Sequence, residues 1–166
     1  GRSAGPALES VDEMADCVVE LLEAVGAVRP VLVGHSMGAA VALEVAARLG
    51  GGAGKLALLG VSEAIPVHPA LLADALERPE QAGVLHTDLK ACDDWKTGPQ
   101  AAAKVTCPTL FLLGGRDRMT PARSARKLAA MISGSRVQVI DKSGHMLMSE
   151  APDETLDALV AFVTGD

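Results

Sequence analysis

The residue in this chain best suited to covalent chemistry is Ser36, which stands between two glycines in the run G-H-S-M-G at 34–38. An apolar run, 31–33, comes before it and small apolar residues, 39–43, follow, so the pattern predicts a strand, a tight turn and a helix. A serine at such a turn projects from the edge of a sheet and becomes a nucleophile when a base removes its proton. Because the turn strains the backbone, we expect any side chain in place of either glycine to crowd it. An ordinary glycine-rich turn is the alternative interpretation.

A base and an orienting carboxylate for Ser36 are each predicted to follow a later strand. Asp117 comes just after an apolar run, 108–113, and His145 lies in the loop after 136–140, where polar and apolar residues alternate. The carboxyl ends of parallel strands meet at one edge of a sheet, so the three side chains are expected to converge there. A serine, a histidine and an aspartate in contact form a triad for acyl transfer.

Two other acids compete with Asp117 for the role of partner to the histidine. Glu63 follows an earlier strand, and Asp141 ends the same strand that delivers His145. Asp117 itself has an alternative role, as a turn or cap residue of the helix that follows it. Its placement relative to Ser36 and His145 favours the catalytic interpretation.

The remaining histidines are expected to have other roles. His35 lies inside the serine turn and is expected to pack there, whereas His68 and His86 fall in the middle of the chain and are expected at the surface or beside a pocket. Their spacing does not suit a metal site, so no metal ion and no cofactor is expected.

The order of these residues, each after a successive strand, resembles the α/β-hydrolase fold family in its serine-nucleophile, esterase-like members. The resemblance runs along the whole chain. It is strongest over 34–40, 107–121 and 144–153, and weak over 63–103. Family members with an aspartate nucleophile are disfavoured, because position 36 is serine.

The resemblance implies a role for each residue at the expected site. Ser36 is the nucleophile, His145 is the general base and acid, and Asp117 orients the imidazole and stabilises its charged form. The backbone N–H of Met37, just after the nucleophile, is an oxyanion donor. In the family, the second donor comes from a loop that we expect to be missing from this sequence.

Compared with that family, the sequence begins late. Residues 1–5 resemble the end of a glycine-rich loop that comes before the helix preceding the nucleophile strand, so the first four strands of the family are expected to be missing. We therefore expect a single, N-terminally incomplete α/β-hydrolase domain over 1–166. Within it, 63–106 is expected to form a short lid-like insertion.

The hydrophobic periodicity predicts four strands that alternate with helices. The strands are expected at 31–33, 56–61, 108–113 and 136–140, and the main helices at 11–25, from the serine turn to 49, 121–132 and 152–163. This alternation predicts an α/β fold with a parallel sheet. With the strands in chain order and right-handed crossovers, the three crossover helices fall on one face and the final helix on the other.

The expected sheet has an exposed edge at its first strand. The strands read as nearly continuous apolar runs, which favours cover on both faces. The first strand, however, lacks the neighbour that it would have in the family. We therefore expect the chain to self-associate through this edge.

Composition narrows the classes of partner. The chain has 166 residues and a net charge of −6, which fits one domain and argues against nucleic acid or an anionic membrane as a partner. No apolar stretch approaches the roughly 18 residues of a spanning helix, and no signal-peptide pattern is present. The three cysteines, at 17, 92 and 107, are expected to be reduced packing residues, which favours the cytoplasm.

Two hypotheses for function follow. The first is a hydrolase that cleaves an ester or related small-molecule acyl substrate through an acyl-enzyme; thioesterases, carbon–carbon hydrolases and cofactor-free haloperoxidases share the triad and stay open. The second is a non-catalytic binding module or an inactive truncated fragment. Large apolar residues of the middle segment are candidates to line an acyl pocket, although ordinary helix packing is the favoured explanation for any one of them. They are Leu71, Leu72, Leu76, Val84, Leu85, Leu89 and Trp95.

Overall fold

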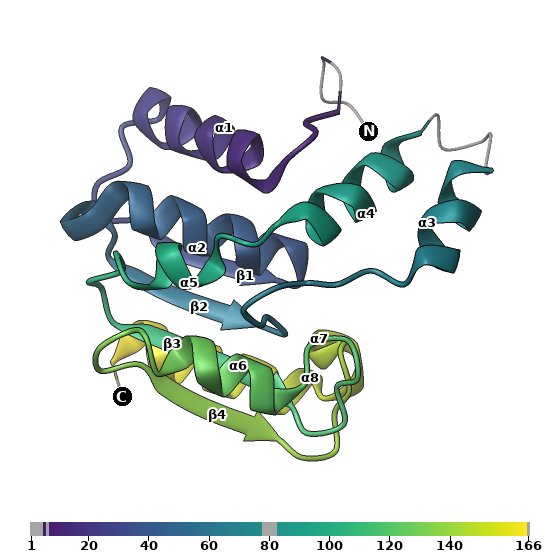
Figure 1. Cartoon of the computed structure of the whole chain (residues 1–166). Helices are drawn as coiled ribbons and strands as arrows, with labels where there is room; N and C mark the ends of the chain where they lie inside the picture. Colours follow the sequence, from purple (N-terminus) through teal and green to yellow (C-terminus); the bar gives the residue numbers. More distant parts are fainter. Residues whose placement is uncertain (1–4, 6, 78–82, 166) are drawn as a thin grey trace.

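Four parallel strands lie side by side in chain order and form one sheet in the computed structural model (Figure 1). They are β1 (Val31–His35), β2 (Lys55–Leu59), β3 (Thr109–Gly114) and β4 (Arg136–Ile140). The structure describes residue 5 and residues 7–77 and 83–165, so most of the segment 1–5 lies outside the described residues. The predicted α/β class, the number of strands and the parallel sheet are confirmed.

Helices cover the two faces of the sheet unequally. One face carries α2 (Met37–Leu49), α5 (Gly98–Ala102) and α6 (Ala122–Ala129), and α1 (Val11–Ala24) packs on the outside of α2 (Figure 1). The other face carries α8 (Pro152–Thr164). A short 3-10 helix, Gly50–Gly52, follows α2. This arrangement is the one predicted from crossovers in chain order.

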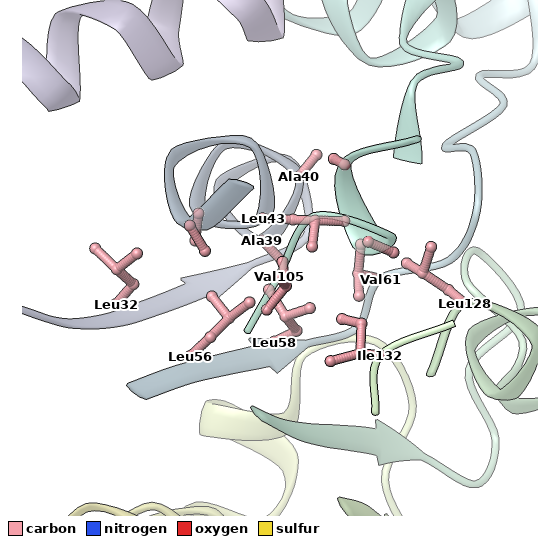
Figure 2. Packing of buried hydrophobic residues seen from close by; sticks show 14 of the residues in the cluster. Leu32, Ala39, Ala40, Leu43, Leu56, Leu58, Val61, Val105, Leu128 and Ile132 are labelled. Atoms are coloured by element: carbon pink, nitrogen blue, oxygen red, sulfur yellow. The ribbon is translucent and has the colours of Figure 1, made fainter. Parts of the chain in front are cut away.

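Alternation along each strand supplies two separate cores. Leu56 and Leu58 of β2 face α2, where Figure 2 shows them beneath Ala39 and Leu43, while Ala57 and Leu59 turn to the opposite face. The opposite core is smaller and is closed by residues of α8. Its buried members are Ala57, Leu59, Leu110, Leu112, Ile140, Leu147, Ala151, Ala158 and Phe162. All six residues of β3 are buried, because this strand lies inside the sheet with helices on both faces.

The first strand does not have the cover that its apolar sequence predicts. Val31 and Val33 are 43% and 51% exposed, whereas Leu32 on the other face is buried beneath α2. The helix α8 reaches β3 and leaves this part of the second face open. The expectation of cover on both faces is therefore wrong for β1 among the described residues.

A buried carboxylate on α2 ties the middle of the chain to the helical layer. Glu44 accepts hydrogen bonds from Nε1 of Trp95 at 3.0 Å, from the hydroxyl of Thr97 and from the guanidinium of Arg48 at 2.9 Å. Arg48 also donates to Asp12 on α1 at 2.6 Å, so one network links α1, α2 and the chain before α5. Trp95 is 3% exposed, which makes it part of the core rather than the lining of an open pocket.

Two helices of the middle segment project past the carboxyl ends of β1 and β2. They are α3 (Pro69–Leu76) and α4 (Val84–Asp94), and they pack against each other (Figure 1). The backbone N–H of Val67, before α3, donates to Oδ1 of Asp93, at the end of α4, at 2.9 Å. The two ends of this excursion are therefore held together by a direct hydrogen bond.

Candidate active site

The turn at Ser36, the predicted nucleophile, connects β1 directly to α2. Its backbone has φ +54° and ψ −121°, a region that residues other than glycine rarely adopt and that costs on the order of 1–3 kcal/mol. The sheet compensates, because the N–H of Ser36 donates to the carbonyl oxygen of Leu59 at 2.9 Å and extends the β1–β2 ladder through the turn. The hydroxyl does not cap α2. It is therefore available for chemistry at the edge of the sheet.

The two flanking glycines differ in how much space surrounds them. A Cβ at Gly34 would lie 2.1 Å from the carbonyl oxygen of Gly38, a distance that no side chain tolerates, so the expected crowding is confirmed there. A Cβ at Gly38 would meet nothing within 4 Å among the described residues. The expectation of crowding at 38 is wrong, because this residue already lies in the first turn of α2 on its exposed side.

The structure brings the three predicted side chains into direct hydrogen-bond contact. Nε2 of His145 lies 2.9 Å from Oγ of Ser36, and Nδ1 lies 2.8 Å from Oδ2 of Asp117. Since a carboxylate only accepts, Nδ1 carries the proton and Nε2 is left as the acceptor for the serine hydroxyl. The imidazole is largely buried between them, with 12% of its side chain exposed.

Asp117 is held as an ionised acceptor. Burial by itself raises the pKa of this carboxyl, but hydrogen bonds from the hydroxyl and N–H of Thr120, and then from His145, together bring the pKa below its ordinary value. Oδ1 accepts from the N–H groups of Met119 and Thr120 at 2.8 and 2.9 Å. Oδ2 accepts from the hydroxyl of Thr120 at 2.6 Å. The carboxylate therefore stays charged and fixed beside the imidazole.

The space for the imidazole depends on a glycine that follows β2. Gly60 has φ +56°, and a Cβ there would lie 3.2 Å from Cε1 of His145 and 3.6 Å from Oδ2 of Asp117. A side chain at this position would push against the histidine–aspartate pair as well as straining the backbone. The absence of a side chain at Gly60 thus leaves the space that the histidine–aspartate pair occupies.

Among the described residues, the side chains of Thr120, His35 and Glu150 form hydrogen bonds at the site that were not predicted from the sequence. Thr120 supports Asp117, His35 bonds the backbone of His145, and Glu150 bonds the loop around that histidine. The contact of Thr120 with Asp117 was predictable from the sequence, since a threonine three residues after an aspartate in a turn can hydrogen-bond back to it. His35 was expected only to pack, and nothing in the local pattern distinguished Glu150 from a solvated helix residue.

The rival candidates lie elsewhere or have other partners. Glu63 forms an ion pair with Lys127 at 3.1 Å, and Asp141 is exposed beyond β4. His68 caps α3, where its Nδ1 accepts from the N–H of Ala70 at 3.2 Å, and His86 lies on α4. Over residues 5, 7–77 and 83–165, the structure contains no group of three or more His, Cys, Asp or Glu side chains arranged to hold a metal ion.

Met37, the expected oxyanion donor, is the first residue of α2. The N–H groups in the first turn of a helix have no partner within the helix, and the helix dipole places partial positive charge at this end. The N–H of Met37 is therefore free of intrahelical bonding beside Ser36.

No helix in the described part of the chain is long and apolar enough to cross a bilayer.

Comparisons with known proteins agree with this fold. A sequence model of the alpha/beta hydrolase family matches residues 1–158. Epoxide hydrolase A of Mycobacterium tuberculosis is 36% identical over 74 residues, which are 43% of this chain and 23% of that protein. The sn-1-specific diacylglycerol lipase ABHD11 of Mus musculus is 28% identical over 79 residues, 48% of this chain and 26% of that protein.

Solved structures match over a longer range. The structure of a thermophilic esterase superposes with a TM-score of 0.83 and 28% identity, covering 99% of this chain and 77% of that one. The sequence matches, by contrast, span about a quarter of the two curated relatives. The family pattern covers far more than half of the sequence, and the sheet, turn and helices follow the same plan. This chain therefore belongs to the alpha/beta hydrolase family.

Proposed function

We propose that this chain is a serine hydrolase that cleaves an ester or a related small-molecule acyl substrate through an acyl-enzyme on Ser36. The observation that carries the proposal is the position of the His145 imidazole, 2.9 Å from Oγ of Ser36 and 2.8 Å from Oδ2 of Asp117. Both contacts have the length of good hydrogen bonds. The two contacts imply that Nδ1 of His145 carries a proton and that Nε2 can accept one from Ser36, as a nucleophilic serine requires.

In the acylation step, Oγ of Ser36 attacks the carbonyl carbon while its proton passes to Nε2 of His145. The carbonyl oxygen becomes an oxyanion, which the N–H of Met37 stabilises with one hydrogen bond. Asp117 stabilises the imidazolium formed in this step. When the intermediate collapses, Nε2 returns its proton to the departing alcohol oxygen and the acyl group stays on Ser36.

In the deacylation step, the same groups act on water. Nε2 of His145 accepts a proton from a water molecule whose oxygen attacks the acyl carbon. Collapse of the second tetrahedral intermediate returns the proton to Oγ of Ser36 and releases a carboxylic acid. The serine and the neutral imidazole are regenerated, so neither a metal ion nor a cofactor enters the proposed cycle.

The substrate side of the site is assigned to the segment 63–106, which we propose acts as a short lid. Its helices α3 and α4 lie past the carboxyl ends of the strands, and they carry exposed apolar side chains, among them Leu71, Leu76 and Val84. Such a surface suits an apolar acyl or alcohol group. A cytoplasmic location is proposed with it, because Cys17, Cys92 and Cys107 are all free thiols.

The test is trapping of the acyl-enzyme. The chain is treated with a fluorophosphonate, and with p-nitrophenyl acetate in a rapid-mixing experiment, and the modified peptide is identified by mass spectrometry. We expect stoichiometric label on Ser36 and a burst of nitrophenol. Ser36→Ala is expected to lose the label and to lower turnover by a factor on the order of 10⁶.

Ser133→Ala is the matched control, since it removes a hydroxyl from an exposed turn after α6. This variant is expected to label and turn over as the unchanged chain does. A folded chain that shows neither label nor burst would contradict the hydrolase and support the alternative, a non-catalytic binding module. Label on another serine would overturn the assignment of Ser36.

A further inference from the structure

The loop that carries His145 is held at its backbone by two side chains outside the triad. The carboxylate of Glu150, at the end of the short helix α7 (Leu147–Glu150), accepts two hydrogen bonds from this loop. Oε2 accepts from the N–H of Gly144 at 2.8 Å and Oε1 from the N–H of Met146 at 2.9 Å. One carboxylate thus bridges the N–H groups of the two residues that flank the histidine.

The second contact comes from the nucleophile turn. Nε2 of His35 lies 2.8 Å from the carbonyl oxygen of His145. A carbonyl oxygen only accepts, so Nε2 of His35 carries a proton and donates it. The two imidazole rings lie with their centroids 4.9 Å apart. The same turn that presents Ser36 therefore also holds the main chain of its base.

These two contacts act on one peptide unit. The carbonyl group of His145 and the N–H of Met146 belong to the same planar amide, whose oxygen is bonded by His35 and whose N–H is bonded by Glu150. An amide fixed at both ends cannot rotate about the bonds that set the direction of the histidine side chain. The carboxylate also lies close to Gly144 itself, because a Cβ at this position would be 3.1 Å from both carboxylate oxygens of Glu150.

We propose that Glu150 and His35 are positioning residues, which clamp the backbone of His145 and thereby keep its imidazole between Asp117 and Ser36. This inference rests on the proposed function for its effect on turnover, but the clamp itself is a property of the loop. The hydrogen bonds of both side chains to this loop go to its backbone and not to the imidazole of His145. Their loss is therefore expected to affect the chemical step rather than substrate binding.

The first test combines kinetics with matched substitutions. Glu150→Gln keeps the size of the side chain but turns one acceptor into a donor that faces a backbone N–H. We expect kcat to fall by roughly 10- to 100-fold with KM within about twofold, since a displacement of about 1 Å of a catalytic group costs on the order of 10²-fold. Glu154→Gln is the control, because it removes a carboxylate of α8 that pairs with Lys142, and kcat is expected to stay unchanged.

The second test separates the hydrogen bond of His35 from its bulk. His35→Leu removes the donor and is expected to lower kcat. His35→Gln keeps an N–H donor at a similar reach and is expected to restore most of the activity, a rescue that a mere packing role would not give.

The clamp is also measured without turnover. Amide hydrogen exchange by NMR on the folded chain reports directly on the N–H groups of Gly144 and Met146, which are expected to exchange faster in Glu150→Gln and as in the unchanged chain in Glu154→Gln. If the chain shows no turnover but this acceleration occurs, the proposed function fails and the clamp stands. If exchange and kcat both stay as in the unchanged chain in Glu150→Gln and His35→Leu, the clamp is wrong whatever the activity of the chain.

Discussion

The hydroxyl of Thr120 donates a 2.6 Å hydrogen bond to Oδ2 of Asp117, the same oxygen that faces the imidazole of His145. The hydroxyl lies 3.4 Å from Nδ1 of the histidine, so the three groups meet around a single carboxylate oxygen. Thr120 thus fixes the direction of the carboxylate and helps to hold its pKa below the ordinary value. This contact makes the stability of the fold depend on pH in a definite sense.

The first prediction concerns Thr120→Val in acid. A carboxyl whose pKa is lower in the folded than in the unfolded chain contributes stability above its unfolded pKa, near 3.8, and loses it as pH falls through the folded value. Thr120→Val weakens this contribution, so the variant is expected to be less stable than the unchanged chain at pH 6. The difference in the free energy of unfolding between the variant and the unchanged chain is expected to narrow below about pH 4. Urea unfolding at a series of pH values measures it, with Thr120→Ser as the control that keeps the hydroxyl.

A gap between Thr120→Val and the unchanged chain that is constant with pH would mean that the hydroxyl acts through packing alone. The burial of Thr120, at 1% exposure, supplies such a packing contribution in addition. Only the part of the difference that varies with pH belongs to Asp117.

The second prediction identifies the acid of the triad. Asp117→Asn preserves the shape of the side chain but no longer stabilises an imidazolium, so kcat is expected to fall by a factor on the order of 10⁴. Glu63→Gln breaks only a half-exposed pair with Lys127 and is expected to change kcat by less than about tenfold. Steady-state kinetics on both variants decides whether Asp117 or Glu63 is the acid of the triad. A larger loss in Glu63→Gln would move the acid to the earlier strand.

The third prediction uses the two glycines of the nucleophile turn as each other's control. Gly34→Ala forces a Cβ against the carbonyl of Gly38 and is expected to destabilise the chain by about 3 kcal/mol or more. Gly38→Ala meets open space within a helix and is expected to be neutral or stabilising by up to about 1 kcal/mol. Thermal unfolding of the two variants checks the difference. Equal losses would show that the turn is crowded on both sides.

The fourth prediction concerns self-association of this chain through β1. We propose that a second copy of the chain covers this strand, since Val31 and Val33 are half exposed and border an apolar groove of about 250 Å³ with Val18 and Val41. Val33→Lys is expected to shift the chain toward monomer in analytical ultracentrifugation. Val28→Lys adds the same charge in the preceding turn and is expected to leave the association unchanged. A monodisperse monomer of the unchanged chain would contradict the proposal.

Sequence patterns predicted the parts of this molecule that depend on local chemistry. Ser36 and Asp117 each follow a strand with a clear apolar run, and His145 follows a strand in which polar and apolar residues alternate. The carboxyl ends of parallel strands bring such residues together whatever the details of packing. The strand β3 was also predictable from the sequence, because an uninterrupted apolar run fits a strand that is buried on both faces.

The missed features depend on tertiary distances that no local pattern encodes. His35 contacts His145 across 110 positions of sequence, and Val33 lies on an edge strand to which α8 does not extend. The same holds for the open space around Gly38, which is set by what packs beside the first turn of α2. These outcomes follow from the arrangement of whole elements in space rather than from the residues nearby.

The hydrogen bond between Val67 and Asp93 has a consequence for how such a protein can diversify. It closes the excursion through α3 and α4 at its base, while the bonds of Trp95 and Thr97 to Glu44 anchor the chain where it returns to the helical layer. The entropic cost of closing this excursion is thus offset by the bonds where its two ends meet. That cost grows only slowly with the number of residues between the ends. Insertions, deletions and exchanges between Val67 and Asp93 are therefore expected to leave Ser36, His145 and Asp117 in place. Under the proposed function, the residues that carry out the reaction are thus inherited independently of the residues that select the substrate.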